Sequence, residues 1–234
     1  MTSKSIVYLI PSFLSEESIE TIPTYIIAAL KNCQIIFAEN ERTARRFLKS
    51  ICKEIIIDEY EWHTIHKVEA EQLTVFKQKI KEEKNIAIIS EAGCPGIADP
   101  GQILINAAQQ LNATVKPLVG PSSILLALMA SGMNGQQFQF VGYLPIDAHQ
   151  RTLKLKELEE ESARKKCTQI FIETPYRNNQ MLETILKNCK PATQLCIAAD
   201  ITSKNEFIKT TSIGEWKNNK IDLHKKPVIF LLLA

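Results

Sequence analysis

The stretch "NIAIISEAGCPGIADPGQILINAAQQL" (85–111) joins two apolar segments through a turn that is rich in glycine and proline. Three of the chain's 8 glycines lie within this turn (90–101), beside two prolines and the carboxylates Glu91 and Asp99. The continuously apolar "NIAIIS" predicts a buried strand, whereas "QILINAAQQL" has the spacing of a helix. The stretch therefore predicts a strand, a tight loop and a helix in succession, which is the repeating unit of an α/β fold.

The rest of the first half repeats this alternation of strand and helix signals. Short apolar segments predict further strands at residues 5–11, 34–39, 53–58 and 113–119. Short apolar strands that alternate with helices indicate a parallel sheet covered on both faces. We therefore predict an N-terminal α/β domain over residues 1–117 that carries the glycine-rich loop.

The second half predicts another α/β domain, over residues 118–234, in which the sheet is mixed. The predicted strands lie at residues 139–144, 168–174, 193–200, 206–213 and 227–234. The last of them are spaced like hairpins, which indicates antiparallel pairing. Pro117, Gly120 and Pro121 interrupt the pattern between the halves. The domain boundary is therefore placed there, and a two-lobed molecule is expected.

Helices of the second half are predicted at residues 122–133, 150–166 and 178–188. Within the first of them, apolar residues recur at intervals of three and four, which is the spacing of one helix face. This spacing predicts a buried side formed by Ile124, Leu125, Leu128 and Met129.

Composition and charge are ordinary for a globular protein, with 45% apolar and 23% charged residues among 234. The formal net charge of +2 neither indicates nor excludes nucleic-acid binding, because a near-neutral chain can carry a local basic patch. No apolar run approaches the roughly 20 residues that span a bilayer. The N-terminal "KSIVYLIP" is also too short for a signal peptide, so we expect no membrane association.

The six cysteines form no C-x-x-C pair and show no spacing typical of metal ligands. Most of them lie in or beside apolar segments, as reduced structural thiols do, so we expect a cytoplasmic protein without disulfides. His63 and His66 are three residues apart, but no third ligand accompanies them. No bound metal is therefore expected.

The glycine-rich loop follows a strand of the predicted parallel sheet, at the edge where α/β proteins bind their ligands. It matches neither G-x-G-x-x-G nor G-x-x-x-x-G-K-[ST], and no lysine follows it, so phosphate binding is disfavoured. Glu91 and Asp99 would repel a phosphate, but they suit a ligand that carries an ammonium group. The alternative is a tight structural turn capped by acidic residues.

The loop "SEAGCPGIADPG" resembles the S-D-A-G-T-P-G-I-S-D-P-G signature of the tetrapyrrole-methylase superfamily, and within it that of the bacterial 16S rRNA cytidine 2′-O-methyltransferases. Four further segments resemble motifs of that group in the same order: "AENERTARRFL" (38–48), "GPSSILLALMASG" (120–132), "FVGYLP" (140–145) and "FIETPYRNNQML" (171–182). On these five ordered motifs, which cover both halves, the chain is identified as a member of the superfamily.

The resemblance implies a bilobal α/β methyltransferase, usually a homodimer, that binds S-adenosylmethionine in a cleft between its domains. It implies that Glu91 pairs with the ammonium group or a ribose hydroxyl of the cofactor. Backbone groups of the loop and of the helix start near Ser122 would take the carboxylate, because helix N-termini suit anions. The residues implied to bind the cofactor are Pro11, Ser90, Glu91, Ala92, Gly93, Cys94, Pro95, Pro121, Ser122, Ser123, Leu144, Pro175, Tyr176 and Ala198.

Methyl transfer from a sulfonium is an in-line displacement, and much of its catalysis can come from positioning the reactants. The spacing reveals no Ser-His-Asp or Cys-His arrangement. The candidate catalytic residues are Glu41 and Arg42, in the segment "NERTARR", and Arg177, which the resemblance places at a strand-to-helix turn that faces the cleft. For Arg177, the alternative is a structural ion pair with Glu173.

Basic residues in the helix predicted at 42–50 are candidates for contacts with RNA. Arg45, Arg46 and Lys49 would neutralise phosphates and make binding depend steeply on salt. The alternative is a solvated helix face beside the buried Leu48.

Several segments depart from the pattern of the superfamily. The chain has "LIPSFLSEES" (9–18), without glycine, where the family has a Thr-Pro-Ile-Gly-Asn turn. Cys94 replaces a threonine, Tyr176 replaces a histidine, and nothing follows the last predicted strand, where longer rRNA enzymes carry an extension. We expect a methyltransferase that acts on a ribose 2′-hydroxyl of ribosomal RNA. The alternatives are a tetrapyrrole or other small molecule as acceptor, and a catalytically inactive module that binds the cofactor.

Overall fold

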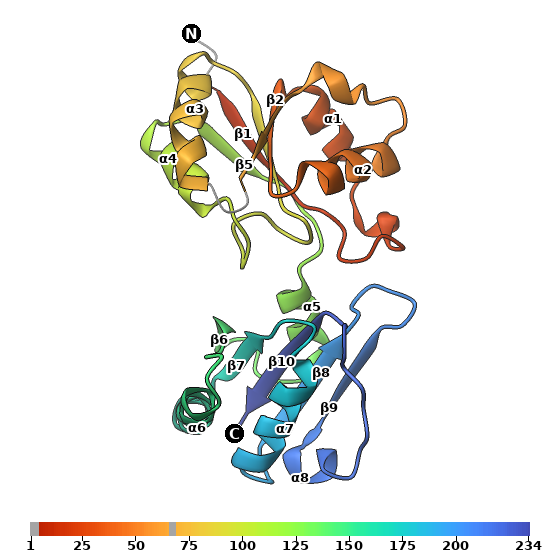
Figure 1. Ribbon diagram of the computed structural model, residues 1–234, viewed down its shortest axis with the longest axis vertical. Helices are drawn as coiled ribbons and strands as arrows, with labels where there is room; N and C mark the ends of the chain where they lie inside the picture. Colours follow the sequence, from red (N-terminus) through yellow and green to blue (C-terminus); the bar gives the residue numbers. More distant parts are fainter. Residues whose placement is uncertain (1–4, 66–68) are drawn as a thin grey trace. The chain divides into compact units, whose positions relative to one another are not determined.

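The computed structural model describes residues 5–65 and 69–234 of the chain (Figure 1). The chain divides into two compact units, Met1–Ser122 (unit one) and Ser123–Ala234 (unit two). Each unit has its own five-stranded sheet and its own hydrophobic core. His66, considered above as a metal ligand, lies outside the described residues.

Unit one contains a parallel sheet with the strand order β3-β2-β4-β1-β5. Its strands are β1 (Ile6–Ile10), β2 (Ile35–Ala38), β3 (Glu61–Thr64), β4 (Ile86–Ile89) and β5 (Thr114–Pro117). Its helices are η1 (Ile19–Thr21), α1 (Tyr25–Lys31), α2 (Glu41–Ile51), η2 (Ile57–Glu59), α3 (Glu69–Lys81) and α4 (Gln102–Gln110). The parallel sheet confirms the fold class predicted for this half.

Helices cover both faces of the sheet of unit one, with α1 and α2 on one side and α3 and α4 on the other (Figure 1). Because side chains alternate along a strand, neighbouring residues belong to different cores. Ile36 packs in the core of α1 and α2, whereas Phe37 packs in the core of α3 and α4, and both are fully buried. Strands β2 and β4 are buried along their whole length, which explains their continuously apolar sequences.

The strand predicted at 53–58 is wrong, because the third strand in sequence is β3, which begins only at Glu61. The apolar residues of the predicted segment do not share one environment: Ile55 is 3% exposed, whereas Ile56 is 57% exposed. The observed strand reads "EWHT" and lies at the edge of the sheet, where only one side needs to be apolar. Its His63 ring stacks on Phe37, with centroids 4.7 Å apart, and so covers the core.

The segment between β5 and the end of unit one belongs to unit one, although the predicted boundary lies before it, between residues 117 and 118. The Leu118 amide donates a hydrogen bond to the Leu9 carbonyl at 3.1 Å, and the Val119 amide donates one to the Tyr25 hydroxyl at 2.6 Å. These contacts extend the path of β5 beyond the proline at which the pattern of the sequence breaks.

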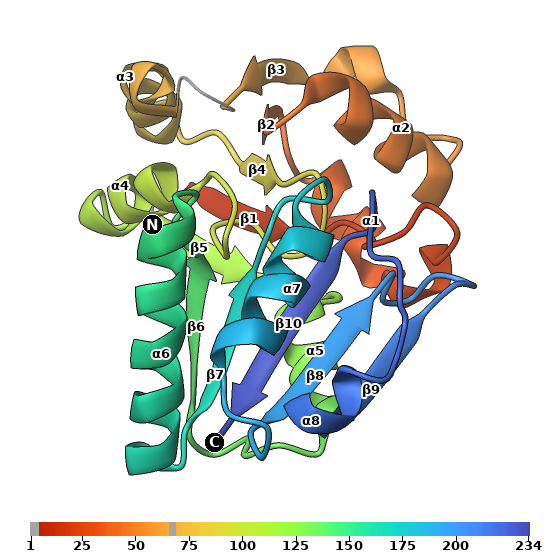
Figure 2. The ribbon, with the colours of Figure 1, turned by 60° about the horizontal axis from the view of Figure 1, so that its bottom comes forward.

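Unit two contains a mixed sheet with the strand order β6-β7-β10-β8-β9. Only β6 and β7 pair in parallel, and the other neighbours are antiparallel, as the sequence predicts. Its strands are β6 (Phe138–Tyr143), β7 (Thr168–Ile172), β8 (Gln194–Ala199), β9 (Phe207–Ser212) and β10 (Val228–Leu233). Its helices are α5 (Ser123–Ser131), α6 (Ala148–Lys165), α7 (Asn178–Asn188) and α8 (Ile213–Trp216). Figure 2 shows α7 and α8 on the viewer's side of this sheet and α5 behind it.

The buried side of α5 differs from the predicted one. Ile124 and Leu128 are buried as expected, but Leu125 is 51% exposed and Met129 is 78% exposed. The helix reads "SILLALMAS" and is apolar almost all round, so its spacing does not single out one face. Packing against β9 and β10 makes that choice, and it buries Ala127 in place of the two exposed residues.

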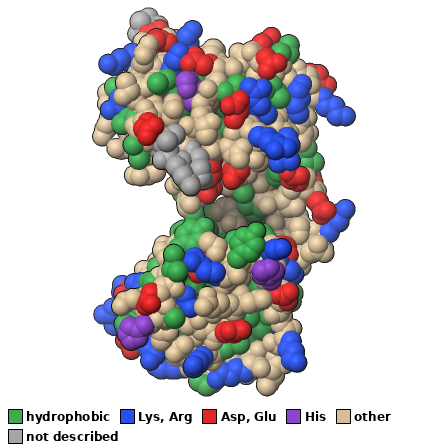
Figure 3. All heavy atoms as spheres, in the orientation of Figure 1, with side chains coloured by type: hydrophobic (Ala, Val, Ile, Leu, Met, Phe, Trp, Pro, Cys, Tyr) green, Lys and Arg blue, Asp and Glu red, His purple; other side chains and the backbone are tan. Residues whose placement is uncertain are grey.

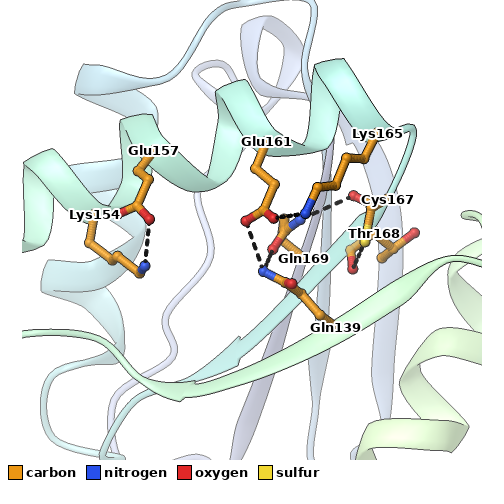
Figure 4. A network of polar contacts seen from close by, with 8 residues as sticks. All are labelled: Gln139, Lys154, Glu157, Glu161, Lys165, Cys167, Thr168 and Gln169. Carbon is orange, nitrogen blue, oxygen red and sulfur yellow. Dashed lines mark hydrogen bonds and ion pairs between the residues drawn. The ribbon is translucent and has the colours of Figure 1, made fainter.

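Strand β6 is an outer strand of the sheet of unit two and carries a β-bulge between Phe140 and Gly142. Gly142 has φ +77°, a backbone angle that favours glycine. Polar side chains connect this strand to its neighbours (Figure 4). Gln139 donates to Gln169 of β7 at 2.6 Å and to Glu161 of α6 at 3.1 Å, so the buried Gln169 amide oxygen has a partner.

Within the part of the chain that the structure describes, none of the helices combines the length and the apolar composition needed to cross a membrane.

Candidate functional site

Three loops of unit one meet at the carboxyl ends of neighbouring strands. They follow β4, β1 and β5, which are adjacent in the sheet and parallel, so their carboxyl ends lie at one edge. Ser12 and Gly93 exchange backbone hydrogen bonds of 2.9 and 3.1 Å between the first two loops. The Ser12 hydroxyl also donates to the Ser90 carbonyl at 2.6 Å. The glycine-rich loop is therefore fixed to the loop after β1.

Two positions in these loops require glycine, one because of its backbone angle and the other because a neighbouring ring leaves no room for a side chain. Gly93 has φ +72°, in the left-handed region. Gly120, in the loop after β5, lies so close to the Pro11 ring that a Cβ atom at this position would overlap it. The loop after β1 has no glycine of its own, but the glycine facing it provides the close approach. The departure noted at residues 9–18 therefore still leaves the backbones of these loops in contact.

Three carboxylates gather at the same edge of unit one. The Glu91 amide donates to the Glu39 carboxylate at 3.0 Å, and the Thr43 hydroxyl donates to the Glu91 carboxylate at 3.2 Å. Burial, together with the negative charges of Glu39 and Glu91, raises the pKa of Asp99 to about 7. Such a group of acids favours a cation, so the loop can hold a ligand that carries an ammonium or sulfonium charge.

The raised pKa of Asp99 has a consequence for stability that can be measured. An acid with a raised pKa stabilises the fold least once it is ionised, so stability is lost as the pH rises from about 4 to 7. We expect Asp99→Asn to raise the free energy of unfolding at pH 8 by about 1–2 kcal/mol, allowing for partial exposure, and to change it little near pH 4.

Urea unfolding at the two pH values measures this difference, with Glu17→Gln, which removes an exposed carboxylate of unit one, as the control. A variant at position 99 that is no more stable than the original protein at pH 8 would contradict the assignment.

Cys94, which replaces a threonine of the family motif, remains a thiol that links two of the loops. Its sulfur lies 3.6 Å from the Pro121 carbonyl, to which it donates a weak hydrogen bond. Burial and the nearby Asp99 raise the pKa of this thiol, so it stays protonated at neutral pH. It can therefore act as a donor in the position of the missing hydroxyl, although a weaker one.

The predicted site on α2 is a set of basic residues that acids partly neutralise. Arg45 pairs with Glu41 at 2.8 Å and with Asp58 at 3.2 Å, and its guanidinium lies 4.9 Å from the centre of the Trp62 ring. Arg46 pairs with Glu16 at 3.5 Å. On the face of unit one in Figure 3, Lys and Arg side chains are interspersed with Asp and Glu side chains.

The remaining candidates on α2 lie near its ends. Asn40 caps the helix by accepting hydrogen bonds from the amides of Arg42 and Thr43, so Arg42 lies in the first turn with an exposed side chain. Lys49, in the last turn, donates to the Lys53 carbonyl at 2.9 Å.

Arg177 of unit two forms the ion pair that the sequence offers as its structural alternative. Its Nε and Nη2 atoms donate to one oxygen of Glu173 at 3.1 and 2.6 Å. The Glu173 side chain is 1% exposed, whereas that of Arg177 is 28% exposed. Among the described residues, no partner is found for Arg177 Nη1, so part of the guanidinium remains available for a ligand.

The other cofactor candidates differ in accessibility. Those of unit one, namely Pro11, Ser90, Glu91, Ala92, Gly93, Cys94, Pro95, Pro121 and Ser122, all belong to the three loops described above. Ser123 begins α5 in unit two. Leu144 is 3% exposed and packs in the core of unit two, and Ala198 is fully buried in β8. Pro175 and Tyr176 are exposed in the turn after β7.

Glu39 and Ser12 contact the loop but were not identified from the sequence. Glu39 directly follows β2, the neighbour of β4, so its place at the carboxyl end of a strand was a usable signal. Ser12 has no such signal, because its role depends on a backbone contact with Gly93.

The described residues were also compared with the requirements of metal sites and disulfides. In the described ranges, no three histidine, cysteine or acidic side chains come together in a way that could hold a metal ion. All six cysteines are free thiols. Burial raises the pKa of Cys33 and of Cys189 to about 12, as expected of structural thiols.

Comparison with known proteins gives a consistent result. Residues 20–217 match the family described as Tetrapyrrole (Corrin/Porphyrin) Methylases. Ribosomal RNA small subunit methyltransferase I of Buchnera aphidicola subsp. Acyrthosiphon pisum (strain APS) is 31% identical, over 97% of this chain and 78% of that protein. The protein of the same name from Mycobacterium tuberculosis (strain ATCC 25618 / H37Rv) is 30% identical, over 81% of this chain and 65% of that protein.

Two solved structures share the fold. The crystal structure of the methyltransferase CobJ has a TM-score of 0.67 and 17% identity, covering 99% of this chain and 95% of that one. Uroporphyrin-III-C-methyltransferase from Thermus thermophilus has a TM-score of 0.57 and 13% identity, covering 98% of this chain and 92% of that one.

Proposed function

This chain belongs to the tetrapyrrole (corrin/porphyrin) methylase family, and on that premise we propose that it methylates a ribose 2′-hydroxyl of small-subunit ribosomal RNA. The family and the named relatives make it an S-adenosylmethionine-dependent methyltransferase. The observation that carries the proposed acceptor is the 31% identity, over 97% of the chain, to a relative named as a ribosomal RNA methyltransferase. The two similar structures, at 17% and 13% identity, support only the fold.

The negative charge of the loops of unit one supports their binding a cationic cofactor such as S-adenosylmethionine. When bound, the cofactor supplies an electrophilic methyl group on a sulfonium. We propose that the carboxylates of Glu91, Glu39 and Asp99 attract its positive charges, and that the raised pKa of Asp99 falls when a cation binds. The backbone between Ser90 and Pro95, beside Pro11 and Pro121, would lie against the cofactor where side chains would obstruct it.

The residues of this chain would then act mainly by positioning the acceptor hydroxyl. In-line transfer needs the hydroxyl oxygen and the methyl carbon about 3–3.5 Å apart in a site that excludes water. Among the described residues nothing pairs with Arg177 Nη1, so this donor could hold an acceptor phosphate or hydroxyl, whereas Glu41 is already paired with Arg45. We therefore favour Arg177 over Glu41 as the residue that touches the acceptor, and Arg42, whose side chain is exposed, stays a candidate.

The experiment that tests this function is methyl transfer from labelled cofactor to purified small ribosomal subunits that lack the modification. We expect label in the ribosomal RNA, and mass spectrometry of its nucleosides to place the methyl group on a ribose 2′-hydroxyl. Transfer to a tetrapyrrole precursor, with none to RNA, would replace the acceptor by a small molecule. Cofactor binding without turnover on any acceptor would indicate an inactive binding module.

A homodimer in the cytoplasm also forms part of the proposal. Leu125 and Met129 project from α5 with 51% and 78% of their surface exposed, an apolar pair that a second copy could cover. A ribosomal substrate would place the protein in the cytoplasm, where its six free thiols stay reduced. Sedimentation equilibrium of the original protein and of Met129→Lys tests the dimer, which the lysine is expected to weaken.

Neutralising the arginines of α2 tests whether this helix contacts RNA. The logarithm of the RNA-binding constant falls linearly with the logarithm of the salt concentration. We expect Arg45→Gln with Arg46→Gln to reduce the magnitude of this slope by about 0.7 for each phosphate that the helix no longer neutralises. Cofactor affinity should not change. The charge-matched control is Lys77→Gln with Lys81→Gln on α3. If both double variants bind RNA alike, α2 is a solvated helix face.

A further inference from the structure

The segment between α8 and β10, residues 217–226, is the most basic loop of unit two. It reads "KNNKIDLHKK", with four lysines, one histidine and a single aspartate. Lys217, Lys220 and Lys225 are exposed, and none of their ammonium groups has a hydrogen-bond or ion-pair partner among the described residues. Lys226 alone approaches an acid, with 3.7 Å between its Nζ atom and the Asp200 carboxylate. Three cationic groups therefore remain available to an external anion.

This loop, called here the basic loop, is held against the turn that follows β7. The Lys225 amide donates to the Pro175 carbonyl at 2.9 Å, and the Asn178 side chain donates to the Lys226 carbonyl at 2.7 Å. The Leu223 amide donates to the Asn179 side chain at 2.8 Å, and the Leu223 side chain is fully buried in the core. Because it is anchored at several points, the basic loop needs little further ordering to bind a ligand.

The one acid of the basic loop, Asp222, already accepts hydrogen bonds from α7 and from the loop itself. Asp222 accepts hydrogen bonds from the Asn179 side chain at 2.8 Å and from the His224 amide at 3.0 Å. These bonds, the one from Asn179 first, lower the pKa of Asp222, so it stays ionised at neutral pH. With four lysines against this one carboxylate, the loop keeps a formal charge of +3 when His224 is neutral.

An exposed aromatic ring lies beside the end of the basic loop that carries His224 and Lys225. Tyr176, in the turn that anchors the basic loop, is 70% exposed, and its ring centre is 5.9 Å from that of His224. The next residue, Arg177, has a guanidinium whose Nη1 has no partner among the described residues. Exposed aromatic rings among cationic side chains are typical of surfaces that bind single-stranded nucleic acid, because bases stack while phosphates are neutralised.

We propose that the basic loop and Tyr176 form a second contact surface for the RNA substrate, which binds a single-stranded segment next to the acceptor nucleotide. Lys217, Lys220 and Lys225 contact phosphates, and Tyr176 stacks on a base. The inference rests on the proposed function and deepens it, since it assigns RNA contacts to unit two. On α2, by comparison, Arg45 and Arg46 already have acidic partners.

Four variants test the surface with a labelled single-stranded RNA of about 20 nucleotides, which is longer than the site of one binding surface. They are Lys217→Gln with Lys220→Gln and Lys225→Gln as one triple variant, Tyr176→Ala, Tyr176→Phe, and a control triple of Lys156→Gln, Lys187→Gln and Lys204→Gln. The control removes the same charge from exposed sites of unit two. One of these sites, Lys187, lies in the last turn of α7, whereas Tyr176 lies just before the first turn of that helix.

The expected results separate phosphate contacts from stacking. Between about 50 and 200 mM salt, the triple variant at positions 217, 220 and 225 should reduce the slope of log binding constant against log salt concentration by up to about 2. The control triple should not change this slope. Tyr176→Ala should weaken RNA binding about tenfold, and Tyr176→Phe should restore it, because the ring is retained. Cofactor affinity, measured by calorimetry, should be the same in both triple variants.

Several outcomes would overturn the inference. If the original protein methylates RNA but both triple variants bind RNA alike, the proposed function stands and the surface is not an RNA contact. If Tyr176→Ala loses cofactor affinity instead of RNA affinity, the ring belongs to the cofactor site. If the first triple weakens binding to polyglutamate as much as to RNA, and Tyr176→Ala changes neither, the loop only attracts polyanions. If the original protein neither binds nor methylates RNA, both the function and the inference fail.

Discussion

Gly93→Val is expected to lower the affinity for S-adenosylmethionine about a hundredfold or more while unit two remains folded. Gly93 has φ +72°, where a β-branched residue is strongly disfavoured. A side chain here would also point at Leu14 Cδ2, 3.4 Å from the position of its Cβ, and at the Pro121 carbonyl, 3.6 Å away. To relieve the strain, the loop must give up its paired backbone hydrogen bonds with Ser12. The backbone proposed to hold the cofactor would therefore move.

The matched control is Gly135→Val, in the turn before β6. Gly135 has no left-handed backbone angle, and nothing lies within 4 Å of a Cβ atom built there, so valine should be tolerated. Calorimetric titration of both variants with the cofactor and with its demethylated product measures the effect, and circular dichroism checks the fold. An unchanged affinity in a folded Gly93→Val protein would refute the assignment of this loop to the cofactor.

Arg177→Met is expected to destabilise the protein by about 3 kcal/mol, because it leaves the Glu173 carboxylate buried without its partner. The Glu173 side chain is 1% exposed, so water cannot replace the guanidinium. Removing the charge of the carboxylate as well, in Glu173→Gln with Arg177→Met, should recover most of the lost stability. Urea unfolding measures both values.

The same double variant separates the structural role of Arg177 from a role in catalysis. If Arg177 touches the acceptor, the double variant is stable but its kcat for RNA methylation stays low. If Arg177 only neutralises Glu173, activity returns together with stability. A single variant as stable as the original protein would show that the ion pair does not hold the turn after β7.

Most of the fold could be predicted because its central strands are continuously apolar. Strands β2 and β4 are buried along their whole length, and the sequence signals them directly. Strand β3 was missed because it lies at the edge of the sheet and reads "EWHT", which lacks a continuous apolar run and whose first and last residues are exposed. The exposed side of α5 was missed because the helix is apolar almost all round, and only packing against β9 and β10 selects its buried side.

The site could be predicted only where a single segment defines it. The glycine-rich loop carries its own signal, since Gly93 and Gly101 have the positive φ angles that glycine permits. Contacts between distant segments leave no such signal in the sequence. The overlap that any side chain at Gly120 would make with Pro11 depends on the order of β1 and β5. The pairing of Arg45 with Asp58 likewise depends on where a distant segment folds.

The bulge in β6 also affects how this protein behaves at high concentration. An outer strand presents unpaired amide and carbonyl groups, onto which a strand of another molecule can add and start aggregation. The extra residue, Val141, which precedes Gly142, disrupts the regular repeat of these groups and increases the local twist. A straight incoming strand cannot follow the edge past this point. The glycine that shapes the strand thus also helps to keep the protein in solution.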